Sequence, residues 1–202
     1  MLRRIAVELR DHVPFTALGA VSGIIIMLIV VLANVPAPIS QYIFYTLHPL
    51  HVLLSALVTT AMYSRYRRGK IWAVIVIGYT ASIGLATIHD AVIPYLVGGW
   101  LKVEIGFHLP FIEEWWLVNP AAFVGIGIGY WKQITKLPHW GHVLVSTWAS
   151  LFYFTGFGAA DWLPLLAFVF LFLFFGVWIV CCFSDIVLPL LFVREGLPHQ
   201  HT

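Results

Sequence analysis

The chain has 202 residues, of which 61% are hydrophobic and only 10% are charged, and its mean hydropathy is +0.93. Soluble domains carry about 25% charged residues, so this composition excludes an ordinary soluble fold. A net charge of +2 offers no strongly basic surface, and nucleic acid is not expected as a partner. The expected partners are the lipid bilayer, a small ion or small-molecule substrate, and further copies of the chain in a homo-oligomer.

Six apolar stretches follow one another, and most are long enough to cross a bilayer as a helix of about 20 residues. A short interfacial helix is expected before the first stretch, which is too long for the apolar part of a signal peptide. The segment Asn34–Thr46, which contains Pro36 and Pro38, is predicted to be a loop or a short interfacial piece. The six stretches are Phe15–Ala33, Leu47–Tyr66, Trp72–Leu96, Leu117–Ile134, His139–Phe157 and Trp162–Phe192.

The basic residues predict how the chain is oriented. Of the 11 Lys and Arg residues, only Lys102 falls in a loop on the far side of this layout. By the positive-inside rule, both termini are expected in the cytoplasm, with the protein in the plasma (inner) membrane of a prokaryote. The residues on the cytoplasmic side are Arg3, Arg4, Arg10, Arg65, Arg67, Arg68, Lys70, Lys132, Lys136 and Arg194.

The sequence contains three motifs twice, in the same order. Each half holds three predicted spans, so the second half enters the membrane in the opposite sense. This predicts an all-α integral membrane protein with a 3+3 inverted-topology repeat, residues 1–99 and 100–202, in one membrane domain. The motifs are H-x-x-H-V-L-x-S at His48–Ser55 and His139–Ser146, P-x4-G-x3-G at Pro14–Gly23 and Pro120–Gly129, and D-x-V-x-P-x-L at Asp90–Leu96 and Asp185–Leu191.

Small residues and hydroxyls inside the motifs have predicted roles. The small-x3-small pairs are expected to let helices pack closely. The hydroxyls continue the histidine face of a helix at helical spacing and are expected to line a polar pathway within the bundle. The packing pairs are Gly19/Gly23 and Gly125/Gly129, and the pathway residues are Ser55, Thr59, Ser146 and Ser150.

The histidine motifs and the aspartates predict two metal clusters. From the span boundaries, the first cluster is expected near the outer face and the second near the inner face. Imidazole and carboxylate groups suit Zn²⁺, Mn²⁺, Fe²⁺, Co²⁺ or Ni²⁺. Glu113 and Glu114 either complete the outer cluster or favour the N-terminus of the fourth span. The clusters are His48, His51, His89 and Asp90 outside, and His139, His142 and Asp185 inside.

Other polar groups have simpler interpretations. Cys181 and Cys182 are expected to behave as small hydrophobic residues. His108 is expected to be solvated in an outer loop, His12 has no repeat partner, and the tail histidines His199 and His201 have no specific role. A structural alternative for both clusters is that the His–Asp pairs only lock neighbouring helices together.

These features favour a small secondary transporter or permease, for a divalent metal cation or coupled to protons, over an enzyme. One alternative is an intramembrane metalloenzyme, in which the outer cluster holds Zn²⁺ or Fe²⁺ and acts on a lipid-like substrate. The other is a haem-binding electron carrier with His51 and His89 as axial ligands. The inverted layout with intramembrane acids resembles the general plan of the lysine-exporter superfamily, which includes manganese and nickel effluxers; the resemblance is one of architecture.

Overall fold

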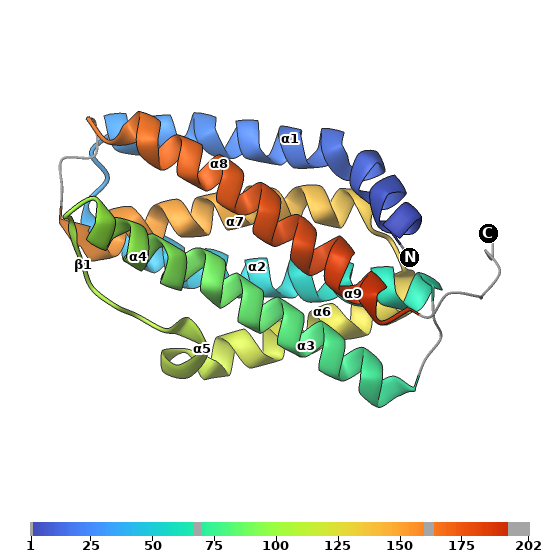
Figure 1. Ribbon diagram of the computed structural model, residues 1–202. Helices are drawn as coiled ribbons and strands as arrows, with labels where there is room; N and C mark the ends of the chain where they lie inside the picture. Colours follow the sequence, from blue (N-terminus) through green and yellow to red (C-terminus); the bar gives the residue numbers. More distant parts are fainter. Residues whose placement is uncertain (1, 67–69, 160–163, 194–202) are drawn as a thin grey trace.

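The computed structural model describes residues 2–66, 70–159 and 164–193, and its elements are mostly long helices (Figure 1). Two helical rods are continuous, because a π-helical turn joins α3 to α4 and another joins α8 to α9. The helices are α1 (Leu2–Leu32), α2 (Ala37–Tyr66), α3 (Ile71–Thr87), α4 (Ile93–Trp100), α5 (Pro110–Glu113), α6 (Trp115–Lys132), α7 (Lys136–Phe157), α8 (Leu166–Cys182) and α9 (Leu188–Leu191), and the π-helical turns are Ile88–Val92 and Phe183–Val187.

The helices run along one long axis, with α2 and α7 in the middle of the bundle. In Figure 1, α1 lies above this pair and α6 lies below it, α8 descends from the upper left across the pair to the lower right, and the rod of α4 and α3 runs from the height of the pair at the left to below it at the right. The central helices are buried accordingly: Ala56 and Val58 of α2 and Tyr153 and Phe154 of α7 have no exposed surface. The strands β1 (Glu104–Ile105) and β2 (Gly158–Ala159) form one short antiparallel pair at the end away from the N-terminus.

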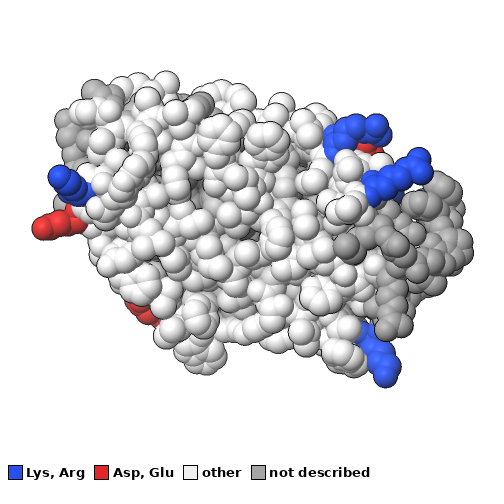
Figure 2. Space-filling model, viewed as in Figure 1, with Lys and Arg blue, Asp and Glu red and all other residues white. Residues whose placement is uncertain are grey.

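Within the described residues, three helical segments are long and apolar enough to cross a membrane: Ala37–Tyr66, Ile71–Trp100 and Ala167–Leu191. On the face seen in Figure 2, the charged side chains of the described residues lie toward the two ends of the bundle, and the surface between them is uncharged. The structure therefore agrees with an all-helical membrane protein, apart from the two-residue strands.

Two predicted boundaries differ from the structure. The segment expected to be a loop before Leu47 is largely helical, because α2 begins at Ala37. Pro36 and Pro38 lie where the helix begins, where a missing N–H leaves no helical hydrogen bond broken. The expected interfacial helix and first span are one continuous helix, α1. Arg67, Arg68, Arg194, His199 and His201 lie outside the described residues.

Glycines sit where helices approach closely. A Cβ at Gly125 or Gly129 of α6 would overlap the carbonyl oxygens of Leu53 and Leu57 in α2. A Cβ at Gly19 of α1 would lie 2.8 Å from the Val143 side chain in α7. The packing around Gly23 is not described by the structure. These approaches set α6 against α2 and α1 against α7.

Candidate metal centre

Both predicted aspartates lie in π-helical turns, and the prolines that follow explain why. Proline has no N–H, and its ring clashes with the carbonyl four residues earlier in an α-helix. That carbonyl belongs to Asp90 for Pro94 and to Asp185 for Pro189. The backbone widens instead, so that the Ile93 N–H bonds the Ile88 carbonyl and the equivalent bond forms in the second rod. Single π-helical turns of this kind are frequent at functional sites.

The proline also leaves one carbonyl free in each rod, and a hydroxyl from the central helices takes it. In the π register, the carbonyls of His89 and Ser184 face prolines that have no N–H to donate. The Ser150 hydroxyl donates to the His89 carbonyl at 3.4 Å, and the Thr59 hydroxyl donates to the Ser184 carbonyl at 3.1 Å. Two of the predicted pathway hydroxyls, those of Ser150 and Thr59, therefore donate hydrogen bonds to backbone carbonyls of the aspartate turns.

Asp90 lies at the centre of the first cluster. Its Oδ2 is 2.9 Å from His48 Nδ1 and 2.5 Å from His51 Nδ1. Its Oδ1 is 3.0 Å from His89 Nδ1. All four side chains are buried, with at most 1% of any residue exposed. The helix spacing of three residues, which puts His48 and His51 on one face of α2, lets one oxygen accept from both rings.

Asp185 gathers the second cluster in the same way. Its Oδ2 is 2.8 Å from His139 Nδ1 and 2.5 Å from His142 Nδ1. The four distances of the paired histidines thus agree between the clusters to within 0.1 Å. Among the described residues, neither aspartate has a Lys or Arg in ion-pair contact, so histidines are the only basic partners of these two buried carboxylates.

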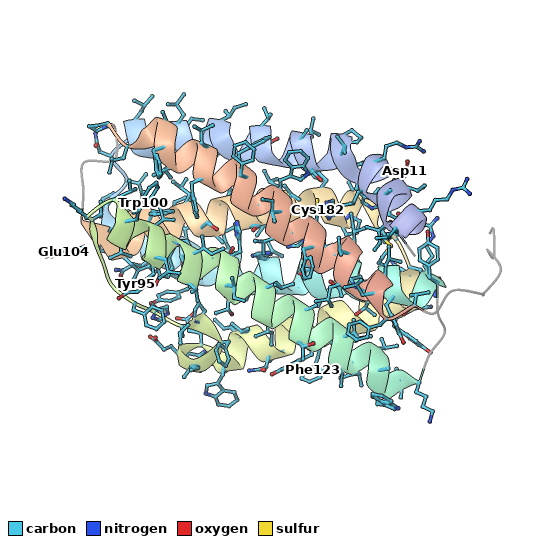
Figure 3. The ribbon with its side chains drawn as sticks, viewed as in Figure 1. Asp11, Tyr95, Trp100, Glu104, Phe123 and Cys182 are labelled. Atoms are coloured by element: carbon cyan, nitrogen blue, oxygen red, sulfur yellow. The ribbon has the colours of Figure 1, made fainter. Side chains whose placement is uncertain are left out.

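The two clusters are not separated across the membrane, as the sequence predicted, but meet at one point. His51 Nε2 lies 2.6 Å from His142 Nε2, and the two ring centroids are 4.5 Å apart. The prediction of separate outer and inner clusters is wrong because α2 begins ten residues before Leu47, which moves His51 to the middle of its helix. In Figure 3, Cys182 of α8 lies between the labelled Asp11 and Glu104, nearer to Asp11.

Hydrogen-bond partners decide how these two rings are protonated. An ionised carboxylate only accepts hydrogen bonds, so His51 and His142 each carry a hydrogen on Nδ1, where they face Asp90 and Asp185. In neutral rings, both Nε2 atoms then present lone pairs to each other. Two lone pairs at this distance repel unless a proton or a metal ion lies between them. The geometry could therefore hold a proton or a metal ion between two rings that are each held by a carboxylate.

Three buried groups of side chains could hold a metal ion, judged by ligand atoms within 4.8 Å of one another. Neither Glu113 nor Glu114 belongs to these groups, and His89 does not either. His89 Nδ1 lies 2.9 Å from both Ser146 Oγ and Ser150 Oγ. The groups among the described residues are His48/His51/Asp90, His139/His142/Asp185 and His51/His142/Cys181.

The predicted acidic ligands lie at the end of the bundle instead. Glu113 pairs with His108 Nδ1 and accepts the backbone N–H of Leu109. Glu114 precedes α6, and its side chain makes no capping hydrogen bond. Burial, with a smaller contribution from Glu113, raises the pKa of Glu114 to about 7. Burial also lowers the pKa of His108 although Glu113 opposes this. His108, expected to be solvated, is 8% exposed.

Several residues of the site were not predicted. His12 packs edge-on against His139 with centroids 5.2 Å apart, and Thr16 Oγ1 lies 3.1 Å from His139 Nε2. No sequence signal linked these α1 residues to the motifs. Cys181 did carry a signal, because it precedes Asp185 by four residues and so shares its face.

Comparison with family models, with curated proteins and with solved structures gives no match. The site is therefore interpreted from its own geometry.

Proposed function

We propose that the chain is a small secondary transporter that carries a divalent transition-metal cation, or is coupled to protons, through one central site. The observation that carries the proposal is the meeting of His51 Nε2 and His142 Nε2 between two buried aspartates. Each aspartate brings a negative charge into the bundle, where an unpaired charge is very unfavourable. A divalent ion, or two protons, balances these charges.

The proposal includes an inverted repeat, and matched contacts across the two halves support it. Ser55 Oγ lies 3.3 Å from Asp185 Oδ1, and Ser146 Oγ lies 3.5 Å from Asp90 Oδ1. Each half thus contributes a serine to the other half's aspartate. Inverted-repeat transporters bind their substrate near the midplane, at the interface of the repeats. A site formed by one histidine from each half suits that plan and lets movement of one half against the other open it.

The aspartates act in this proposal by orienting the ligands. A metal-ligating histidine commonly donates its other ring N–H to a carboxylate, which fixes the ring and makes it a better ligand. Asp90 and Asp185 occupy that position, since their oxygens already accept from Nδ1 atoms. His51 and His142 then ligate through Nε2, while His48 and His139 complete the two carboxylate shells.

The orientation proposed for the membrane keeps both termini in the cytoplasm. Supporting charges are Arg10, Arg65 and Lys132, which lie near the N-terminus of α1, the C-terminus of α2 and the C-terminus of α6 respectively. Lys102 lies after α4, at the opposite end of the layout. The membrane proposed is the plasma membrane of a prokaryote.

The two alternatives from the sequence gain less support. A metalloenzyme would need one cluster, whereas the centre takes a histidine from each. For a haem carrier, His51 would have to ligate iron through a ring whose Nε2 already faces His142 at 2.6 Å and whose Nδ1 faces Asp90.

The proposal is tested by metal content and transport of the purified protein. We expect wild-type protein to retain a transition metal on elemental mass spectrometry and to move it into proteoliposomes. His51→Ala and His142→Ala should each reduce bound metal and uptake at least about tenfold, as loss of even an outer-shell partner does. His108→Ala, the same substitution at the end of the bundle, serves as the matched control and should retain both.

Protons are distinguished from metal in the same vesicles with an internal pH dye. If no metal binds, a proton flux that both central variants abolish would assign the site to protons. Metal content and proton flux that both stay at wild-type level in His51→Ala and His142→Ala would contradict the proposed centre.

A further inference from the structure

Cys181 lies beside the point where the two clusters meet. It is in the last turns of α8 and is 1% exposed. Its Sγ lies within 4.8 Å of ligand nitrogens of both His51 and His142. The thiol also lies 3.4 Å from Ser146 Oγ, which places it on the inward face of its helix. A cysteine on one helix thus faces one histidine from each half of the chain.

Of the three candidate groups, this is the one that contains no aspartate. In the two groups that contain an aspartate, the carboxylate oxygen already accepts two Nδ1–H donors. In the group with Cys181, the histidines present Nε2 atoms that face each other. A cation here gains two nitrogens and a sulfur without displacing either aspartate from its ring.

We propose that Cys181 is the third ligand of this site, together with His51 and His142, and that the site selects a thiophilic cation. This rests on the proposed function and narrows its substrate class. Cys181 ligates as the thiolate, so its S–H proton is released when the ion binds. Thiolate and imidazole ligands suit zinc, cobalt, nickel or copper(I), whereas manganese and magnesium prefer oxygen ligands. Three protein ligands leave a tetrahedral ion with one open position. An open position lets the ion exchange, as a transported ion must.

Ordinary ligand distances fit the site after a small movement. Zinc–nitrogen bonds are about 2.0–2.1 Å and zinc–sulfur bonds about 2.3 Å, so tetrahedral nitrogens lie about 3.3 Å apart. The present separation of the Nε2 atoms is 2.6 Å. The rings therefore separate by less than an ångström as the ion enters between them, and the Nδ1 bonds to the two aspartates guide that movement.

The neighbouring cysteine provides a matched control. Cys182 Sγ lies 3.7 Å from Thr16 Oγ1 and 4.0 Å from His139 Nε2, on a different side of α8 from the meeting point. Cys182 is also buried, with 6% of its surface exposed. It belongs to none of the three candidate groups among the described residues. The two cysteines therefore separate ligation from the general effect of losing a thiol.

The experiment loads the purified full-length protein with Co²⁺ and records its absorption spectrum. Wild-type protein should show a sulfur-to-cobalt charge-transfer band in the near ultraviolet. Cys181→Ser and Cys181→Ala should lose that band. In both variants, the preference for Zn²⁺ over Mn²⁺ should fall at least about tenfold. Cys182→Ser should keep both. Size-exclusion chromatography of each variant identifies any that has simply failed to fold.

The outcomes separate this inference from the proposed function. Cobalt that binds to wild type without a charge-transfer band, or a band that survives both Cys181 substitutions, overturns sulfur ligation and leaves the central histidine site standing. A band lost in Cys182→Ser instead also overturns it. Failure of wild type to bind any Co²⁺ or Zn²⁺ overturns the inference together with the metal branch of the proposed function, while proton transport through His51 and His142 is measured independently.

Discussion

The Asp90 and Asp185 clusters share a frame but differ in what surrounds it. Each carboxylate holds two histidines of an H-x-x-H motif from a π-helical turn. Asp90 has a third histidine beside it, His89, where the second rod has Ser184. Asp185 has Cys181 one turn earlier, where the first rod has Ala86. The His–Asp contacts that the two clusters share position the rings of His51 and His142. His89 adds a hydrogen bond to the Asp90 cluster, and Cys181 adds a thiol beside the Asp185 cluster.

The largest expected contrast comes from removing charge at each aspartate. Asp90 Oδ1 has His89, Ser146 and Ser150 as neighbours, whereas Asp185 Oδ1 has Ser55. A buried donor left without an acceptor costs about 1–3 kcal/mol. We expect Asp90→Asn to lower the free energy of unfolding by about 3 kcal/mol and Asp185→Asn by about 2 kcal/mol. Denaturant titration of the protein in detergent micelles measures both.

Metal content of these two variants gives the control. Both aspartates hold a central ring, so both substitutions should weaken binding by about 10- to 100-fold. Equal loss of stability would show that the additional partners of Asp90 contribute nothing measurable. Loss of metal in one variant alone would break the equivalence of the two clusters.

The packing glycines offer a second contrast between the halves. Gly125 of α6 faces the Leu53 carbonyl oxygen of α2, and backbone cannot move away without shifting the helix. Gly19 of α1 faces the Val143 side chain and the Trp140 carbonyl at 2.8 and 3.1 Å. Overpacking costs about 1–3 kcal/mol. We expect Gly125→Ala to destabilise by about 2 kcal/mol and Gly19→Ala by less, as measured by the thermal unfolding midpoint.

A substitution at Gly127 tests whether close contact with α2 is the cause of the destabilisation expected for Gly125→Ala. Apart from its chain neighbours and the adjacent backbone of its own helix, no atom of the described residues lies within 4 Å of a Cβ built there. Alanine is favoured over glycine in a helix by about 1 kcal/mol. Gly127→Ala should therefore raise the unfolding midpoint slightly. A fall equal to that of Gly125→Ala would mean that any alanine in this helix is harmful, irrespective of contact with α2.

The sequence predicted which residues cluster around each aspartate but not where along the bundle the two clusters lie. The repeated motifs identified the four motif histidines and both aspartates, because side chains three apart share a helix face. The aspartate–proline spacing also held the signal for the π-helical turn, since Pro94 and Pro189 stand four residues after Asp90 and Asp185. These are local relations, and local relations can be read from spacing.

Relations between helices were out of reach. Whether His51 and His142 meet depends on where α2 starts and how α2 crosses α7. Pro36 and Pro38 predict a loop before Leu47, but they stand at the start of a helix. Thr16 and His12 reach His139 only because Gly19 brings α1 against α7. Contacts of this kind depend on packing, which motif spacing does not encode.

The smallest expected effect comes from making the halves alike at His89. The sequence placed His89 among the metal ligands, whereas its Nδ1 is engaged with Asp90, Ser146 and Ser150 and it belongs to none of the candidate groups among the described residues. His89→Ser introduces the residue that the second rod has at Ser184. We expect a loss of about 1 kcal/mol from the missing hydrogen bonds, with metal content unchanged. Loss of the metal, measured by elemental mass spectrometry on folded protein, would instead make His89 a ligand, and the two halves would then differ in the coordination of the ion and not only in the support around it.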